Sequence, residues 1–237
     1  MSKTLLRHDA NKILGLLTRS EAQDIMKMAR LVDLPAGKTL YVTGERISRF
    51  YFVTTGLVSL VGTGEEEETI GLGLAGNEGV IGCLAVLERP LMPFTVVMMT
   101  KGSALQIPSE TVLKLCLARE SVRKALLKSI NLLFGQVILS AVCNSAHSIE
   151  QRLSRWLLLG FDLCGSQDLR VTQQDLAVML GVARPTISLA VANLAKSGFI
   201  GHRRGIIRLL DRNGLARAAC SCYRSLSEEY GGFFGLE

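Results

Sequence analysis

The pattern of apolar and polar positions changes twice along the chain. Up to about Arg30, apolar residues recur at helical spacing, first at Ile13, Leu14 and Leu17 and then at Ile25, Met28 and Leu31. From residue 34 to residue 108, short apolar runs are broken by glycine, proline and polar turns. The first pattern predicts one or two amphipathic helices, and the second predicts many short strands in a sandwich or small barrel.

After Pro108 the apolar positions return to helical spacing. Ser109 or Thr111 is expected to begin one helix, and a second, long helix is expected from about Ser121 to Cys143. Within the long helix, apolar residues step by three and four, the spacing at which two helices pack together. These residues are Leu126, Ile130, Leu133, Val137 and Ala141. The seam either pairs with a second copy of the chain or is buried within one monomer, and Leu127, Phe134 and Ile138 extend the apolar surface sideways.

The stretch from residue 171 to residue 196 predicts two short helices joined by a tight turn. Thr172 and Asp175 have the spacing of a capping box at the start of the first helix. Gly181 follows where the turn requires a positive φ or an uncrowded backbone. Pro185 suits the first turn of the second helix. A buried stripe is then expected from Ile187, Ala190, Val191 and Leu194.

A basic hairpin is predicted directly after this pair of helices. Residues 199–210, FIGHRRGIIRLL, have the pattern of two strands with the turn at Arg203-Arg204-Gly205. A helix-turn-helix beside an arginine-tipped wing is suited to grip the phosphates of duplex DNA. Helix pairs with a glycine turn also occur in proteins that bind no DNA. The alternative for the wing is that its charged side chains only contact solvent. One helix with Trp156 in its core is expected before the motif, at residues 148–159, and one last helix is expected to pack on the wing domain.

Charge and composition narrow the classes of protein. The formal net charge is +6, and Arg and Lys crowd the part after Arg152, whereas the first half carries the acidic run Glu65–Glu68. No secretory signal is evident, and residues 129–149 contain too many polar side chains for a good membrane span. The six cysteines lack the spacing of a secreted disulfide framework. We therefore predict a cytoplasmic protein with reduced thiols and no membrane partner.

The order of these parts resembles the Crp/Fnr family of bacterial transcription regulators. YFVTTGLVSL is similar to the strand–glycine–strand signature of the family, and GNEGVIGCLAVLE occupies the place of its nucleotide-phosphate cassette. HSIEQRLSRWLLL and TQQDLAVMLGVARPTISLAVANLAKSGFI resemble its DNA-binding domain. The ending HRRGIIRLLDRNGLARAACSCY is similar to a subgroup with a closely spaced cysteine pair.

The resemblance implies an α+β fold with three parts. A cyclic-nucleotide-binding-like β-roll, or jelly roll, is expected at 1–118, a long dimerisation helix at 119–145, and a winged helix-turn-helix domain with a C-terminal helix at 146–237. The expected function is a homodimeric, sequence-specific transcription regulator that reads an inverted repeat in double-stranded DNA. RNA polymerase is a further candidate partner. The second helix of the motif, about Arg184 to Lys196, is expected to enter the major groove.

The expected DNA contacts lie on the motif and the wing. Arg184 matches an arginine that reads guanine in the family, where a bidentate contact supplies identity as well as strength. Pro185 and Leu189 replace polar readers of better-known members, so the operator sequence does not carry over. The full set is Thr172, Gln173, Arg184, Pro185, Thr186, Ser188, Leu189, Asn193, His202, Arg203 and Arg204.

The effector site departs from the pattern of the cyclic-AMP-binding members. Gly79, Gly82 and Cys83 mark the candidate pocket, but Cys83 stands where those members place a ribose-binding Glu. Residues 92–94, Met-Pro-Phe, stand where they place a phosphate-binding Arg. A buried phosphate without that cation has little to offset its desolvation. We therefore expect no control by cyclic AMP and either a collapsed roll or an apolar ligand, the collapsed roll being favoured.

The remaining candidates for chemistry are cysteines and histidines. Three interpretations of Cys220 and Cys222 are open: a thiol switch, two ligands of a metal site, or a buried and inert pair. We favour the buried, inert pair. Two ligands are too few without partners, so no metal and no cofactor is assigned. An iron–sulfur cluster is not expected because the first cysteine is Cys83, and haem ligation by His8 or His147 has weaker support still.

Three rival functions remain open. The first is a regulator that senses thiol state or a metal. The second is a small-molecule-binding β-roll module, and the third is an enzyme of β-barrel type. We predict no enzyme, because the sequence has no metal-ligand spacing, no nucleophile elbow and no phosphate loop joined to a catalytic lysine.

Overall fold

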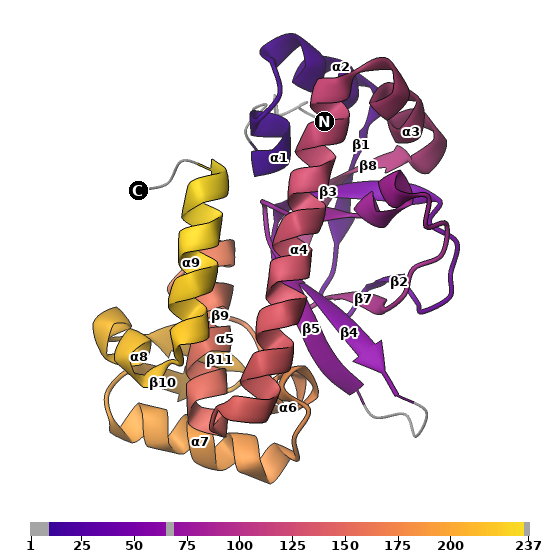
Figure 1. Ribbon diagram of the computed structural model, residues 1–237. Coiled ribbons are helices and arrows are strands. Elements are labelled where there is room, and N and C mark those ends of the chain that lie inside the picture. The colour runs from indigo at the N-terminus through magenta and orange to yellow at the C-terminus, as the bar shows by residue number, and fades with distance from the viewer. Residues whose placement is uncertain (1–9, 65–68, 235–237) are drawn as a thin grey trace.

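The structure is a computed structural model that describes residues 10–64 and 69–234. His8 and the acidic run Glu65–Glu68 lie outside the described residues. Two short helices come first, a β-roll follows, and the second half is mainly helical (Figure 1). This order of helices, short strands and helices is the one that the hydrophobic pattern predicted, and it gives the α+β fold that the resemblance implied.

Two four-stranded antiparallel sheets form the β-roll, one in the order β1-β8-β3-β6 and the other in the order β2-β7-β4-β5. The strands are β1 Arg30–Leu34, β2 Thr39–Tyr41, β3 Arg49–Thr55, β4 Val58–Thr63, β5 Thr69–Ala75, β6 Val80–Ile81, β7 Thr95–Met98 and β8 Gly102–Pro108. A short 3₁₀ helix, η1 (Cys83–Leu87), follows β6. Alternate apolar side chains of the strands, including Val53, Val58 and Val96, fill the interior.

The N-terminal helices close one end of the roll. They are α1 (Lys12–Gly15) and α2 (Arg19–Met28), and Ile13, Leu14 and Ile25 are buried against the roll. The amphipathic pattern was therefore interpreted correctly up to Ile25. It was wrong for Leu31, which lies in β1 and is exposed, because the helix ends at Met28.

The long helix α4 (Glu120–Ala146) follows α3 (Ser109–Ala118) and crosses the roll from end to end (Figure 1). The first two residues of the predicted seam lie in the core of the single chain. Leu126 and Ile130 are buried where α4 packs on the roll, which is the alternative that the sequence left open. Leu133 and Val137 are half-buried, and Ala141 is exposed.

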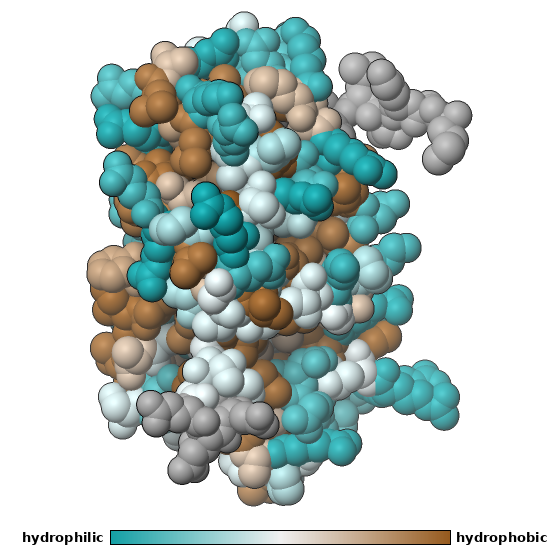
Figure 2. Space-filling view, turned by 90° about the vertical axis from the view of Figure 1, so that its right-hand side faces the viewer, coloured by the Kyte–Doolittle hydropathy of each residue, from teal (hydrophilic) through white to brown (hydrophobic). Residues whose placement is uncertain are grey.

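The outer face of α4, defined here by Phe134, Ile138 and Val142, is what the fold leaves uncovered. Their side chains are 64%, 47% and 48% exposed. In Figure 1, α4 lies in front of the sheets, and the front of Figure 1 becomes the left-hand edge of Figure 2. Apolar residues gather along that edge at mid-height (Figure 2). The helix is apolar around most of its circumference, so periodicity alone did not distinguish the packed face from the free one.

By length and hydropathy α4 is the one helix among the described residues that passes as a possible membrane span. Its inner face carries a polar contact that ties it to the roll. Gln136 accepts a hydrogen bond from Leu74 N (2.8 Å) and donates to Leu74 O (2.7 Å) and to Tyr230 Oη (2.6 Å). A fully bonded, buried amide indicates a helix packed within a protein fold.

The C-terminal part consists of α5 Ile149–Cys164, β9 Asp168–Leu169, α6 Gln173–Leu180, α7 Arg184–Lys196, β10 Ile200–Arg203, β11 Ile206–Leu209, α8 Arg212–Ala218 and α9 Ser221–Phe234. As predicted, Trp156 is buried in its core, with Leu176, Ile187 and Leu194. The prediction of a single last helix is wrong. The chain breaks between α8 and α9, and α9 runs beside α4 instead of packing only on the wing domain (Figure 1).

The two halves touch where β5 meets α6. The backbone of Gly71 lies so close to Met179 that an added Cβ would stand 2.7 Å from the Met179 carbonyl oxygen. Only glycine permits this approach without a shift of the helix. The helix-turn-helix is therefore packed against the β-roll in this conformation.

Candidate nucleic-acid interface

The first helix of the motif begins as its sequence predicted. The Thr172 hydroxyl accepts a hydrogen bond from Asp175 N (3.1 Å), and the Asp175 carboxylate accepts one from Thr172 N (2.7 Å). This capping box satisfies amides that the first turn leaves without partners. At the other end, Gly181 has a φ of +61° and turns the chain toward α7. Both features confirm the predicted helix-turn-helix.

The second helix, α7, buries one stripe and exposes the other. Pro185 lies in its first turn, as expected, where a missing N–H costs nothing. The buried side chains are those of the predicted stripe, Ile187, Ala190, Val191 and Leu194. The side chains of Arg184, Pro185, Thr186 and Leu189 are exposed, and Leu189 is 65% exposed.

The wing is the predicted hairpin. In it β10 pairs with β11, with Arg203 opposite Ile206. Arg204 and Gly205 form the turn, both with positive φ, at +41° and +77°. Two such residues make the turn type that suits a two-residue hairpin. An arginine in this region is sterically disfavoured, and such strain clusters at functional sites. Below the tip, Arg208 forms a bidentate ion pair with Asp168 of β9 (2.6 and 2.7 Å).

One surface groove of about 350 Å³ brings six of the predicted contacts together. It lies between the start of α6, the start of α7 and the wing. Its lining includes Thr172, Gln173, Arg184, His202, Arg203 and Arg204. Three guanidinium groups and two exposed helix starts thus face one hollow, an arrangement suited to phosphate oxygens.

Two further candidates are engaged by neighbouring side chains. Ser188 donates to the Gln173 side chain (2.7 Å), which fixes Gln173 beside the groove. Asn193 donates to Glu150 of α5 (2.5 Å), so base reading by Asn193 requires that bond to break. These contacts depend on tertiary packing and were not visible in the sequence.

The candidate effector pocket inside the β-roll is nearly filled. Gly79, Gly82 and Cys83 line it, as predicted, together with Met92 and Phe94. Its volume of about 30 Å³ accommodates about two water molecules. Burial raises the pKa of Cys83 to about 12, so this thiol stays protonated. This small volume fits the favoured expectation of a collapsed roll.

Sequence reasoning missed a buried carboxyl group in this pocket. The Glu78 side chain is 2% exposed and accepts two hydrogen bonds from Gly76 N (3.0 and 3.1 Å). Burial raises its pKa to about 7. Its place within the glycine-rich cassette was the available signal, but charge alone indicated a solvated residue.

The cysteine pair is buried, as the interpretation of inert thiols expected. Cys220 lies in the break before α9 and Cys222 in its first turn. Both lie beside Cys143 and His147, at the end of α4. His147 caps the end of that helix directly before Ser148, the N-cap of α5, and its ring faces Cys222.

Two family models match the chain. One describes a cyclic nucleotide-binding domain and matches residues 31–119, and the other describes a Crp-like helix-turn-helix domain and matches residues 151–218. The first matches the β-roll with η1, and the second matches α5 to α8, which include the groove.

Comparisons of whole chains agree with this division. The chain is 22% identical over 202 residues to the CRP-like cAMP-activated global transcriptional regulator of Mycobacterium tuberculosis, covering 82% of this chain and 90% of that protein. FixK2 from Bradyrhizobium japonicum has a similar structure, with a TM-score of 0.70 at 17% identity, covering 81% of this chain and 98% of FixK2. The c-di-GMP responsive global regulator CLP of Xanthomonas campestris has a TM-score of 0.66 at 17% identity, covering 80% and 98%.

Proposed function

The chain belongs to the Crp/Fnr family of bacterial transcription regulators, and on that premise we propose that it is a homodimer that reads an inverted repeat in duplex DNA. The observation that carries the proposal is the groove shared by Arg184 and the wing arginines. In this proposal α7 enters the major groove while the wing and the start of α6 hold the flanking phosphates. The protein acts in the cytoplasm, where the DNA is.

Base reading is assigned to the exposed start of α7. Arg184 is the first residue of the helix, and its side chain is exposed beside the groove. A guanidinium there forms two parallel hydrogen bonds with the edge of a guanine. Pro185 and Leu189 offer apolar surface, and Leu189 suits contact with a thymine methyl group.

Replacement of Arg184 by Ala is expected to weaken binding to the preferred site by about 1–3 kcal/mol and to relax base preference at one position of each half-site. The measurement is the dissociation constant for the preferred duplex and for its single-base variants. Arg30→Ala, at an exposed arginine on β1, is the matched control and should leave both quantities unchanged. An equal loss on every duplex would remove Arg184 from the base-reading residues.

Loss of both wing arginines is expected to act on all sequences alike. The Arg203→Ala and Arg204→Ala double variant removes two phosphate contacts per chain, which releases fewer counterions on binding. The slope of log K against log salt should become shallower by about 2 for each chain bound. Titrations of one duplex at several salt concentrations measure it, and an unchanged slope would show that the wing arginines are solvated in the complex.

Dimerisation is assigned to the outer face of α4. Phe134, Ile138 and Val142 recur at the spacing of a helix–helix seam and are exposed in the single chain. The two symmetry-related binding surfaces of one dimer then read the two halves of the repeat. The centres of the half-sites are expected about 10–11 base pairs apart.

Cyclic AMP is not part of the proposed control. The pocket holds an apolar Met92 and Phe94, which are buried, and Cys83 with its neutral thiol. Among the described residues that line it, the one ionisable carboxyl group is that of Glu78, which offers no positive charge to a phosphate. Binding of a cyclic nucleotide would therefore desolvate its phosphate without an offsetting cation among these lining residues.

A further inference from the structure

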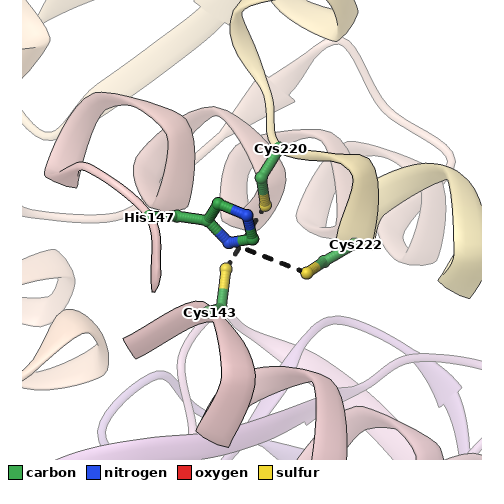
Figure 3. Close-up of side chains that lie close together, drawn as sticks. All are labelled: Cys143, His147, Cys220 and Cys222. Atoms are coloured by element: carbon green, nitrogen blue, oxygen red, sulfur yellow. Dashed lines mark hydrogen bonds between the residues drawn. The ribbon is translucent and has the colours of Figure 1, made fainter. Parts of the chain in front are cut away.

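Four metal-ligand side chains converge where α4, α5 and α9 meet. One ligand atom from each of Cys143, His147, Cys220 and Cys222 lies within 4.8 Å of all the others. Their side chains point toward one another from the end of α4 and the start of α9 (Figure 3). The three thiols are buried and the imidazole is half-buried. Among the described residues this is the one such group of cysteines and histidines.

The local structure explains why the four groups meet. Cys143 and His147 are four residues apart at the end of α4, which places them on the same side of the helix. The break between α8 and α9 brings Cys220 and Cys222 to the same point. The Sγ atoms of Cys143 and Cys220, 77 positions apart in the chain, are 3.3 Å from each other.

The distances are close to those of a tetrahedral zinc site. Zinc–sulfur bonds of about 2.3 Å and zinc–nitrogen bonds of about 2.05 Å place two sulfurs about 3.8 Å apart, and a sulfur and a nitrogen about 3.6 Å apart. Here the Cys143–Cys220 pair is at 3.3 Å, and Cys222 Sγ is 3.8 Å from His147 Nδ1. Shifts of about half an ångström satisfy the tetrahedral geometry for these two pairs.

A buried cation beside the cluster gives independent support. Arg155 of α5 is 6% exposed and lies within electrostatic reach of Cys143 and Cys222. Its Nε has no hydrogen-bond partner, its NH₂ group has only Ser140 Oγ at 3.4 Å, and no carboxylate pairs with it among the described residues. A buried charge without a partner is costly.

Metal binding resolves that imbalance. Three thiolates, a neutral imidazole and a divalent ion carry a net charge of −1, which the Arg155 guanidinium neutralises. Burial, ligand type and local charge therefore agree.

We propose that Cys143, His147, Cys220 and Cys222 bind one Zn²⁺ ion in a closed, structural site. Three sulfur ligands and one nitrogen ligand in a tetrahedron select zinc among common divalent ions. The half-exposed side at His147 is the entry path. The ion ties the start of α9 to the junction of α4 and α5, through which the β-roll is joined to the helix-turn-helix. The proposal is independent of DNA binding.

Metal content and cobalt spectra test the site. The full chain is purified in reductant without oxygen, its bound metal is measured, and the stripped protein is titrated with Zn²⁺ and with Co²⁺. We expect about one zinc per chain, and with Co²⁺ the intense visible bands and thiolate charge-transfer bands of a tetrahedral sulfur-rich site. Zinc affinity should fall at least about tenfold in Cys143→Ser, since even changes around the ligands cost that much.

Matched variants separate metal binding from folding. Cys164→Ser removes a half-buried thiol outside the group and should retain one metal per chain. His147→Ala, at the half-exposed ligand, should keep the far-ultraviolet circular dichroism of the fold and thiolate charge transfer but shift the visible cobalt bands. The proposal is wrong if the reduced protein takes up neither ion, if it holds iron instead, or if Cys143→Ser and Cys164→Ser bind zinc equally well.

Discussion

Replacement of both Phe134 and Ile138 by Asp is expected to give a monomer at micromolar concentration, where the unaltered chain is expected to be a dimer. Both side chains are exposed on the outer face of α4, so the single chain loses little packing when they change. In the proposed dimer, each is an apolar anchor whose loss costs about 2 kcal/mol or more, and the introduced carboxylates also repel one another. The dissociation constant of the dimer should therefore rise at least about 100-fold.

DNA binding should fall with the dimer. Each chain of a dimer contacts one half-site, and the first contact holds the second chain close to the other half-site. A monomer lacks this advantage, so its affinity for the repeat should be lower by about 100-fold or more. Sedimentation and duplex titration measure the two effects. Leu117→Asp, at an apolar side chain of α3 that is 90% exposed, is the control and should stay dimeric. A double variant that remains a dimer would place the interface away from this face.

Replacement of Glu78 by Gln is expected to stabilise the protein at alkaline pH. Burial holds the pKa of Glu78 at about 7 in the folded chain, against an ordinary value of 4.5, so the folded state retains a proton that the unfolded state releases. The favourable contribution of the neutral carboxyl is therefore complete below pH 4.5 and is lost as pH rises through about 7. The loss at higher pH amounts to about 3 kcal/mol.

The Glu78→Gln variant should remove this dependence. The introduced amide oxygen would still accept a hydrogen bond from Gly76 N, and an amide does not ionise. Denaturant unfolding at about pH 8 should therefore show a gain of up to about 3 kcal/mol that vanishes near about pH 4.5. Lys12 favours the ionised form but is the smallest influence on Glu78. Glu228→Gln, at an exposed carboxyl of α9, is the control. The free energy of unfolding could instead change with pH equally in the variant and the unaltered chain between about pH 5 and 7. That result would mean that water reaches Glu78.

The helix-turn-helix and wing were predictable because their signals are local. The Thr172–Asp175 capping box, the positive φ of Gly181 and the Arg204-Gly205 turn each act within a few residues. Local propensities and turn chemistry agree there with the tertiary fold, which is the condition under which sequence reasoning succeeds. The order of strands and helices was accessible for the same reason.

Features that depend on distant packing were not predictable. Leu126 and Phe134 have equivalent apolar character in α4, and only the position of the β-roll decides which of them is buried. Cys220 and Cys222 offered two ligands, and the other two lie more than 70 residues earlier on a different helix. The raised pKa of Glu78 likewise follows from burial, which charge patterning does not report.

Selection of bound sequences from random duplex DNA tests the central claim most directly. The purified chain, without added effector and at moderate salt, is expected to enrich an inverted repeat with half-site centres about 10–11 base pairs apart. Arg184→Ala should enrich the same spacing with one position of each half-site relaxed. Salt-sensitive binding that enriches no sequence, or a single half-site without its repeat, would contradict a dimeric reader of DNA.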